Sequence, residues 1–351
     1  MTALDLLIAM LIAITSAIVV VLATVGISSL IRAHRIRIEP SLSKARSAIM
    51  ISLSGGSTAT DELSDLGWFS RRYIIGLTLD VAPSVTGTSR SILVSLGEAI
   101  GVVQKARRNV NSRRWGSRLY AARVLTAFGV ESDALCRLLV DRSPEVRAQA
   151  AAWTVVAPDP MAIDLLVGLL ADSDGLCRFA ARDALIRIGL RASEPLISAL
   201  DAADVDVDVT NQILEIAAAM GDGRFLPAAV VRTGAPAPRT RALAARVLAR
   251  TGDRSAGPSL VGLLQDGSDE VVVAAAAGIS KLSYWPGAAA IEPLLNSPSW
   301  ALRRQAGLSL LGLGAPGTVL LWANAPGEGD KAEMAIQALH LRSISHRSEA
   351  A

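Results

Sequence analysis

The sequence predicts an all-α protein: a solenoid of stacked helical hairpins preceded by one N-terminal transmembrane helix. Two observations support this fold class. A pair of aliphatic residues returns about every 31 residues through two thirds of the chain, and an uncharged, mostly apolar run extends from Leu6 to Ile31. A fixed period of this length indicates one supersecondary unit per repeat. An apolar run of this length indicates a helix that can cross a bilayer.

The repeated pair occurs six times, at Leu138-Leu139, Leu169-Leu170, Ala199-Leu200, Val230-Val231, Leu263-Leu264 and Leu294-Leu295. Between these pairs, apolar residues follow helical spacing, as at Ile163, Leu166 and Val167. Two helices of roughly 10–14 residues with short polar turns fill one period. Because one hairpin cannot bury its apolar face alone, we expect about seven to stack, with the second helices lining the concave face.

Each period also carries polar positions at fixed places. An Arg follows a short polar step and precedes the Gly or Pro that ends the period by 11 residues, as in Arg118…Gly129 and Arg178…Gly189. An Asp lies six residues before the Arg in two periods, as Asp141/Arg147 and Asp172/Arg178. Val272 replaces the Arg after Asp266, and Asn296 replaces the Asp before Arg303.

These positions carry a resemblance to a known family. The phrase from Leu138 to Ala148 resembles a HEAT repeat of the short bacterial type, as does Gly252 to Leu264, and the likeness extends over residues 112–343. Such repeats are also found in phycobilisome lyase proteins. The resemblance implies a hydrogen-bonded ladder between neighbouring repeats, incomplete at Val272 and Asn296. Its members would be Asp141, Arg147, Asp172, Arg178, Arg241 and Arg303.

The run from Leu6 to Ile31 predicts an uncleaved membrane anchor. A helix of 26 residues is about 39 Å long, enough to cross a hydrocarbon core of about 30 Å with some tilt. A cleaved signal peptide would need a basic start and a shorter apolar run, and this chain has neither. Small residues at Ala9, Ala13 and Ala17 share one face, which can pack against a second copy or a partner span. The other interpretation is that Ala is simply frequent in this chain.

Charge predicts the orientation of the span. No Lys or Arg precedes it, whereas five basic residues follow within 15 positions: Arg32, Arg35, Arg37, Lys44 and Arg46. The positive-inside rule then places the N-terminus outside and the solenoid in the cytoplasm, in a single-pass protein of the cell membrane. The five residues would lie at the membrane surface.

The domain organisation follows from these signals. We expect a transmembrane helix in residues 1–31, a basic juxtamembrane segment and linker in 32–60, and degenerate helical capping repeats in 61–111. The repeat solenoid would occupy 112–344, and a polar, disordered tail 345–351.

A basic run near the start of the solenoid is a candidate binding surface. It contains no acidic residue and comprises Lys105, Arg107, Arg108, Arg113, Arg114 and the neighbouring Trp115. It can bind lipid phosphates or an acidic partner, or it can be a solvated helix end. Trp115 and Trp300 each lie three residues before a repeat Arg. This shared position predicts a packing role, with a partner anchor as the alternative.

The inventory of the chain argues against catalysis and against a cofactor, a metal or a nucleic-acid partner. The three His residues lie outside the regular array, and no nucleophile elbow, Walker loop or Cys-x-x-Cys motif occurs. The acidic segment is explained by favourable charge at a helix N-terminus; it contains Asp201, Asp204, Asp206 and Asp208. The net charge is +3, and one exposed column alternates in sign: Arg123, Asp183, Glu215 and Arg246. Such a column is no phosphate track.

The expected function is therefore a membrane-anchored scaffold that presents a cytoplasmic surface to a membrane-associated protein partner. Similar membrane-anchored HEAT proteins occur in bacteria beside polysaccharide-making glycosyltransferases, so the resemblance implies a partner complex of that kind. The alternative is a HEAT-like lyase or protein-modification factor of the bilin-lyase type. The sequence reveals neither the partner and pathway nor the oligomeric state.

Overall fold

The computed structural model describes residues 101–130, 134–202 and 206–349, with a few isolated positions between 76 and 98. Every secondary-structure element in these residues is an α-helix or a 3-10 helix. The chain divides into two compact units, Met1–Ala134 and Leu135–Ala351. In the first unit, the described elements form one hairpin from α5 (Val102–Asn109) and α6 (Trp115–Phe128), which pack against each other.

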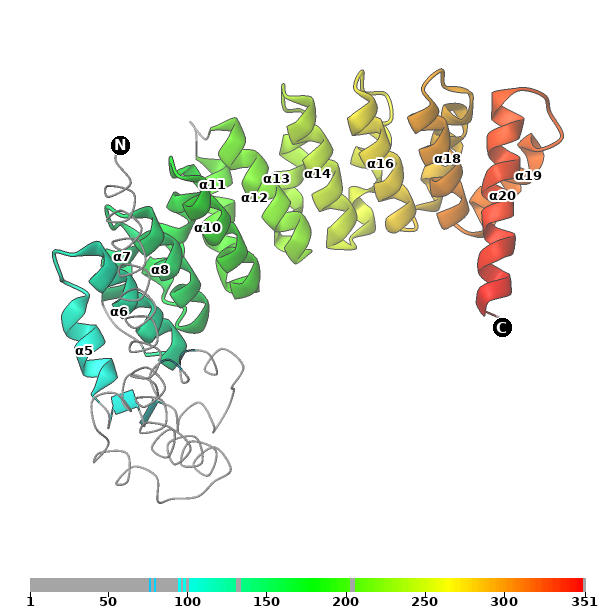
Figure 1. Cartoon of the computed structure of the whole chain (residues 1–351). Helices are drawn as coiled ribbons and strands as arrows, with labels where there is room; N and C mark the ends of the chain where they lie inside the picture. Colours follow the sequence, from blue (N-terminus) through cyan, green and yellow to red (C-terminus); the bar gives the residue numbers. More distant parts are fainter. Residues whose placement is uncertain are drawn as a thin grey trace, which may run out of the picture. The chain divides into compact units, whose positions relative to one another are not determined.

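The second unit is an array of hairpins, each with a short first helix and a longer second helix (Figure 1). The first helices are α7 (Ala134–Leu139), α9 (Pro160–Gly168), α11 (Ser193–Asp201), α13 (Leu226–Arg232), α15 (Gly257–Leu263), α17 (Ala288–Ile291) and α19 (Ala315–Asn324). The second helices are α8 (Pro144–Val156), α10 (Gly175–Ile188), α12 (Val207–Met220), α14 (Pro238–Thr251), α16 (Asp269–Lys281), α18 (Trp300–Gly312) and α20 (Asp330–Glu349). The predicted solenoid of helical hairpins is confirmed.

Short 3-10 helices join the hairpins or extend the first helices: η2 (Leu169–Ala171), η3 (Gly189–Ala192), η4 (Gly223–Phe225), η5 (Arg254–Ala256), η6 (Trp285–Gly287) and η7 (Glu292–Asn296). Local chemistry sets the helix ends. Asp174 caps α10 by accepting hydrogen bonds from the N–H groups of Leu176 and Cys177. Gly221 ends α12 at φ 67°, a left-handed conformation that favours glycine.

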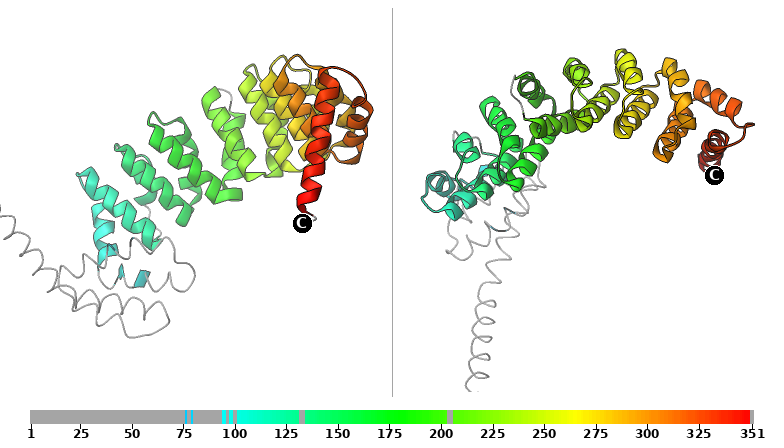
Figure 2. Two further views of the ribbon diagram at one scale, coloured as in Figure 1. Left: turned by 45° about the vertical axis from the view of Figure 1, so that its right-hand side comes forward. Right: turned by 90° about the horizontal axis from the view of Figure 1, so that it is seen from above.

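The second helices pack on one another in sequence order from α8 to α20. Viewed from above, the hairpins of the second unit follow an arc, and α20 lies on its inner side (Figure 2). Small side chains such as Ala150, Ala181, Ala244 and Ala275 are fully buried in the second helices, which lets neighbouring helices approach closely. The second helices thus line the concave face, as expected.

The aliphatic pairs are only partly core residues. Both members are buried at Leu138-Leu139 and at Leu263-Leu264, but Val230 and Val231 are 38% and 67% exposed. Val230-Val231 repeats the aliphatic pair in sequence but not in the core, because α13 buries Ala228 and Ala229 and the preceding turn supplies the buried Phe225.

Three further predictions can be placed against these residues. The predicted span Leu6–Ile31 lies outside the described residues, and no described helix has the length and hydropathy needed to span a membrane. The expected border at 111/112 separates α5 from α6, two helices of one hairpin. Helix α20 continues to Glu349, so residues 345–349 are helical and not the disordered tail that the polar sequence predicts.

Candidate functional site

A ladder of charged pairs connects consecutive hairpins. The repeat Arg is the fourth residue of its second helix, as Arg147 is in α8 and Arg241 is in α14. Arg147 donates from Nε and Nη2 to the two carboxylate oxygens of Asp172 in the next turn, at 2.7 and 2.8 Å. Its Nη1 donates backwards to the carbonyl oxygen of Asp141 at 2.7 Å. The Arg therefore holds its own turn and the next turn together.

Arg241 repeats this geometry three hairpins further along the array. Its Nε and Nη2 donate to Asp266 at 2.6 and 2.8 Å. Arg303 donates to the carbonyl oxygen of Ser297 at 2.7 Å and pairs with Asp330 at 3.1 Å. Arg178 donates to the carbonyl oxygen of Asp172 at 2.6 Å, and no ion pair of Arg178 is present within the described residues.

Where the Arg is missing, the acid in the next turn is missing too. Thr210 and Val272 are the fourth residues of α12 and α16. At 25 residues further on, the spacing that joins Arg147 to Asp172, the chain has Ala235 and Ser297. Asp266 pairs with Arg241 of the preceding hairpin, so it keeps a partner although Val272 replaces the Arg of its own period. Ser297 occupies the position of the missing Asp before Arg303, because Arg303 contacts its carbonyl oxygen. The sequence pattern places this position at Asn296, one residue earlier, which is wrong.

The ladder acids are held in their charged form. Partial burial raises the pKa of Asp172, but hydrogen bonds from Arg147 and from the Asp174 backbone outweigh it, so the net pKa is lowered. The hydrogen bonds from Arg241 lower the pKa of Asp266, against a smaller effect of burial. On the first-helix side, Asp222 accepts from Arg224 and Ser193, and its pKa is lowered to about 2, with the Arg224 hydrogen bond as the largest cause.

A groove opens between α10 and α12 on the second-helix layer, next to α14. Its volume is about 630 Å³, and it is lined by Leu170, Ala171, Asp172, Arg178, Phe179, Arg182, Asp206, Asp208, Val209, Asn211, Gln212, Glu215 and Arg239. Helices α10 and α12 contact each other less extensively than α12 and α14 do. The groove thus lies where neighbouring second helices separate.

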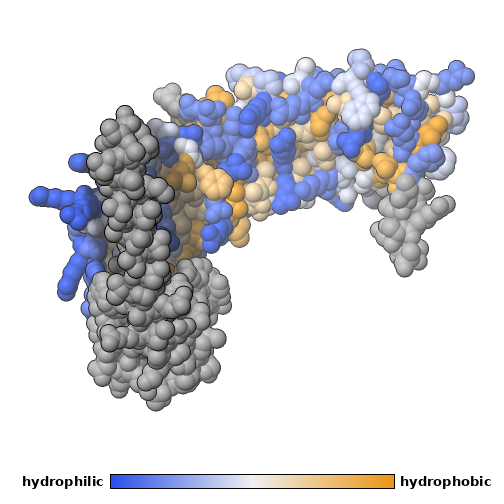
Figure 3. All heavy atoms as spheres, in the orientation of Figure 1, coloured by the Kyte–Doolittle hydropathy of each residue, from blue (hydrophilic) through white to orange (hydrophobic). Residues whose placement is uncertain are grey.

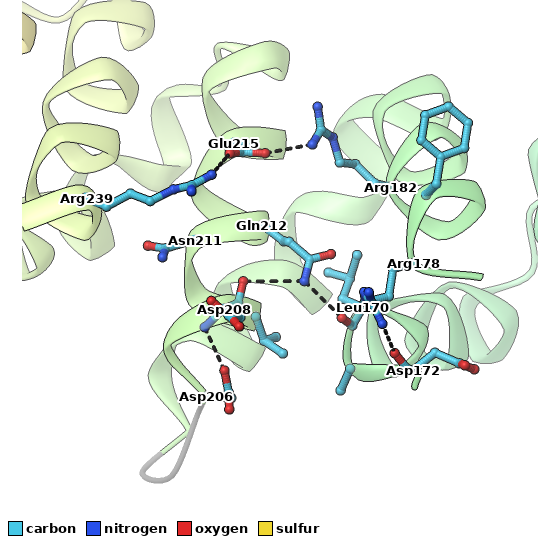
Figure 4. Close-up of a pocket in the computed structure, with 13 residues that line it drawn as sticks. Leu170, Asp172, Arg178, Arg182, Asp206, Asp208, Asn211, Gln212, Glu215 and Arg239 are labelled. Atoms are coloured by element: carbon cyan, nitrogen blue, oxygen red, sulfur yellow. Dashed lines mark hydrogen bonds and ion pairs between the residues drawn. The ribbon is translucent and has the colours of Figure 1, made fainter. Parts of the chain in front are cut away.

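The groove wall is a connected polar surface (Figure 4). Glu215 of α12 pairs with Arg182 of α10 at 2.7 Å and with Arg239 of α14 at 3.1 Å. Gln212 spans to the α10 side by donating to the carbonyl oxygen of Leu170 at 3.1 Å. Asp206 caps α12 by accepting from the N–H of Asp208 at 2.6 Å. Two guanidinium groups share the single carboxylate of Glu215 in this part of the wall. The lining as a whole has four carboxylates and three guanidinium groups, because Asp172, Asp206 and Asp208 also line the groove.

Exposed apolar side chains lie in and around this groove. Phe179 lines it and is 70% exposed, and Leu176 and Val207 at the starts of α10 and α12 are also exposed. Large apolar side chains that remain in water beside hydrogen-bonding groups are typical of anchors for a protein partner. Figure 3 shows hydrophobic patches between hydrophilic ones along the array, on the face it presents.

The predicted binding residues near the start of the solenoid, and both tryptophans, are exposed to solvent. The basic residues Lys105, Arg107, Arg108, Arg113 and Arg114 are all exposed on the α5–α6 hairpin. Trp115 and Trp300 are 53% and 61% exposed, so the predicted packing role is wrong, while the partner-anchor alternative stays a prediction. Arg304 lies over the Trp300 ring, 5.7 Å from its centroid.

The remaining site predictions lie outside the described residues: the membrane-surface group Arg32, Arg35, Arg37, Lys44 and Arg46, and the packing face Ala9, Ala13 and Ala17. Asp201 ends α11, while Asp206 and Asp208 start α12, which fits favourable charge at a helix N-terminus for the latter two. Within the described residues, no group of three His, Cys, Asp or Glu side chains could hold a metal ion.

Sequence reasoning missed the groove. Its central pairs join residues that are 33 and 24 positions apart, Arg182 to Glu215 and Glu215 to Arg239. The available signal was Ala203, because it stands 25 residues after Arg178, where the step from α10 to α12 would need its ladder acid. The alternating column of predicted exposed positions includes Glu215, but the structure leaves this side chain half-buried.

Comparisons with known proteins support the repeat fold. Residues 193–280 match the family model for HEAT repeats. A crystal structure of Kap121p bound to Nup53p is similar, with 13% identity, a TM-score of 0.52, and coverage of 84% of this chain and 37% of that chain. Importin beta is similar with 13% identity, a TM-score of 0.52, and coverage of 84% and 47%. The chain thus spans less than half the length of either, and at this identity the likeness shows the fold alone.

A complex of CpcE and CpcF of phycocyanin lyase from Nostoc matches at 22% identity over 68% of this chain and 93% of that chain. Its TM-score of 0.32 is too low to support an argument about function. The comparison with curated proteins gives no match. The chain is an all-helical solenoid of HEAT-like repeats, a fold typical of protein-interaction scaffolds and mostly not enzymatic.

Proposed function

We propose that this protein is a membrane-anchored scaffold that binds a protein partner in the groove between α10 and α12. The observation that carries the proposal is the groove itself: about 630 Å³, on the second-helix layer, lined by the exposed Phe179 and by Arg182, Glu215 and Arg239. An apolar anchor surrounded by hydrogen-bonding groups matches the composition of protein interfaces, which are rich in aromatic residues and Arg.

The Arg182–Glu215–Arg239 part of the wall favours a peptide segment that carries both carboxylates and apolar side chains. Arg178 has no ion pair within the described residues, and Arg182 and Arg239 share one carboxylate, so a partner carboxylate gains charge-assisted hydrogen bonds here. The amide oxygen of Gln212 can accept from a partner backbone N–H, since its nitrogen already donates to Leu170 and Asp208. Binding then orders few groups of the scaffold, because these side chains already rest on helices.

The membrane part of the proposal rests on the sequence. The run Leu6–Ile31 would anchor the chain with its N-terminus outside and the array in the cytoplasm, close to partners in the same bilayer. The resemblance to membrane-anchored HEAT proteins supports a polysaccharide-synthesis complex with a glycosyltransferase as the partner class. A second copy packed through Ala9, Ala13 and Ala17 is compatible with this arrangement.

The test is co-purification of the full-length protein from crosslinked membranes. We expect an integral-membrane enzyme complex to be recovered, and Phe179→Glu to reduce recovery by about tenfold or more, the loss expected for a central anchor. The matched control is Met161→Glu in α9, because Met161 is 64% exposed but does not line the groove.

Deleting residues 6–31 should move the protein to the soluble fraction and abolish the association. An empty purification under both mild and crosslinked conditions would contradict the scaffold proposal. Equal recovery with Phe179→Glu and with Met161→Glu would contradict the assignment of the groove.

A further inference from the structure

The α5–α6 hairpin of the first unit carries many cations and no anion. From residue 99 to residue 130 the chain contains no Asp or Glu, and it contains seven basic residues: Lys105, Arg107, Arg108, Arg113, Arg114, Arg118 and Arg123. Helix α5 buries Val102, Val103 and Ala106 on one face. The opposite face therefore exposes its basic side chains, and hydrophilic side chains project outward in this part of the chain in Figure 3.

Five of these cations are uncompensated. The side chains of Lys105, Arg107, Arg108, Arg113 and Arg114 have no ion pair and no hydrogen bond within the residues that the structure describes. Arginines on the second helices of the other unit are often paired instead, as in Arg147–Asp172 and Arg182–Glu215. A cluster of unpaired like charges repels itself, so folding alone does not favour it.

The start of α6 adds to this imbalance. Its N-cap residue is Arg114, its first turn has no acidic residue, and no side chain caps it. Cations are unfavourable at a helix N-terminus, because the helix dipole is positive there. In the other unit, α10 and α12 begin with an Asp at the same place. Anions bound along α5 and the α5–α6 turn would relieve both the mutual repulsion and the unfavourable dipole.

We propose that the α5–α6 hairpin binds the anionic surface of a lipid membrane. Lys105, Arg107, Arg108, Arg113 and Arg114 would contact headgroup phosphates, and Trp115 would enter the headgroup layer. The exposed Trp115 favours a membrane over an acidic protein or a nucleic acid, because Trp concentrates at the membrane–water interface beside basic residues. The cations are spread over a helix face and a turn, which suits a surface of many phosphates. The proposal does not depend on the span Leu6–Ile31.

The test measures amide hydrogen exchange in the full-length protein with excess nanodiscs. One set of discs contains phosphatidylcholine, and the other an equal mixture of phosphatidylcholine and phosphatidylglycerol. Each basic residue near an anionic surface contributes about fivefold to binding. We therefore expect residues 102–118 to exchange at least about tenfold more slowly with the anionic discs. High salt should abolish the difference.

The variant that removes Lys105, Arg107, Arg108 and Arg114, each as →Gln, should lose this protection. All four side chains are exposed, so the fold should be retained. The matched control changes four exposed arginines of the second unit to Gln, namely Arg137, Arg142, Arg191 and Arg254, and should keep the protection. Equal exchange in both disc types would overturn the proposal. So would equal loss in both variants, or slowing caused by duplex DNA or RNA but not by anionic discs.

Discussion

Arg147 and Arg241 each connect two hairpins through three backbone or carboxylate partners. The guanidinium plane suits this role, because one edge holds the carboxylate of the next turn while the remaining nitrogen holds the carbonyl oxygens of its own turn. The acids are largely buried: 9% of the Asp172 side chain is exposed. Removing one partner leaves the other both desolvated and unpaired, which costs more than the pair itself contributes.

Arg147→Ala should lower the free energy of unfolding by about 2 kcal/mol, the cost of leaving a mostly buried carboxylate unpaired. The measurement is urea denaturation followed by circular dichroism. The control is Arg187→Ala, since the Arg187–Asp183 pair is more than half exposed on both sides and 3.5 Å long. That change should cost less than about 0.5 kcal/mol. Equal effects of the two substitutions would show that the ladder does not hold neighbouring hairpins.

At the scale of elements, the array depends on how closely helices approach. Gly317 is the third residue of α19, and a side chain there would overlap the backbone of Leu310 in α18. Gly262 in α15 has nothing within 4 Å of the position of an added Cβ. Close packing therefore requires glycine at position 317, whereas the structure leaves room for a side chain at position 262.

Gly317→Ala should destabilise the protein by more than about 2 kcal/mol, because α19 must move away from α18. Gly262→Ala should stabilise it by about 0.5–1 kcal/mol, because Ala restricts the unfolded chain and favours a helix. Thermal unfolding of both variants against the unchanged protein measures the difference. A stable Gly317→Ala protein would mean that α19 does not pack on α18 as described.

The sequence predicts the helices well where a period contains both the repeat Arg and the Gly that ends the second helix. The Arg–Gly spacing places every second helix that has it, because a helix start and a glycine stop are local signals. Val230-Val231 misleads, since spacing alone cannot tell which residues of α13 face the core when Ala228 and Ala229 fill it. The groove could not be predicted, because Arg182, Glu215 and Arg239 come together only after the hairpins stack. The exposure of Trp115 and Trp300 likewise depends on the neighbouring hairpins.

For the whole molecule, the carboxylates predict how stability depends on acidity. Asp172, Asp222 and Asp266 all have lowered pKa values in the folded chain, with Asp222 at about 2 against an ordinary value of 3.8. Because the folded pKa lies below the unfolded one, the stabilisation is present above about pH 4 and is lost as the pH falls toward 2. Asp222 alone should contribute on the order of 1 kcal/mol, after allowance for the solvent exposure of Arg224.

Urea denaturation at several values between pH 7 and pH 2.5 checks this expectation. The free energy of unfolding should decrease toward acid, and Asp222→Asn should give a lower free energy at neutral pH and a shallower decrease. Parallel curves for the two proteins would contradict the assignment of the low pKa to Asp222.

The joint loss of ladder partners also determines how such a chain can be rearranged. Thr210 is matched by Ala235 and Val272 by Ser297, each across the border between hairpins. A hairpin that is moved as one block would bring its Arg to a new neighbour. The acid that paired with this Arg would stay in the turn of the original next hairpin. Recombination with cuts inside the second helices, after the fourth residue, would separate every Arg from its acid. Cuts inside the first helices would keep each Arg with its own turn but would also separate it from the acid of the next turn, as a cut in α9 separates Arg147 from Asp172. A single acid at each seam therefore decides whether exchanged modules fit.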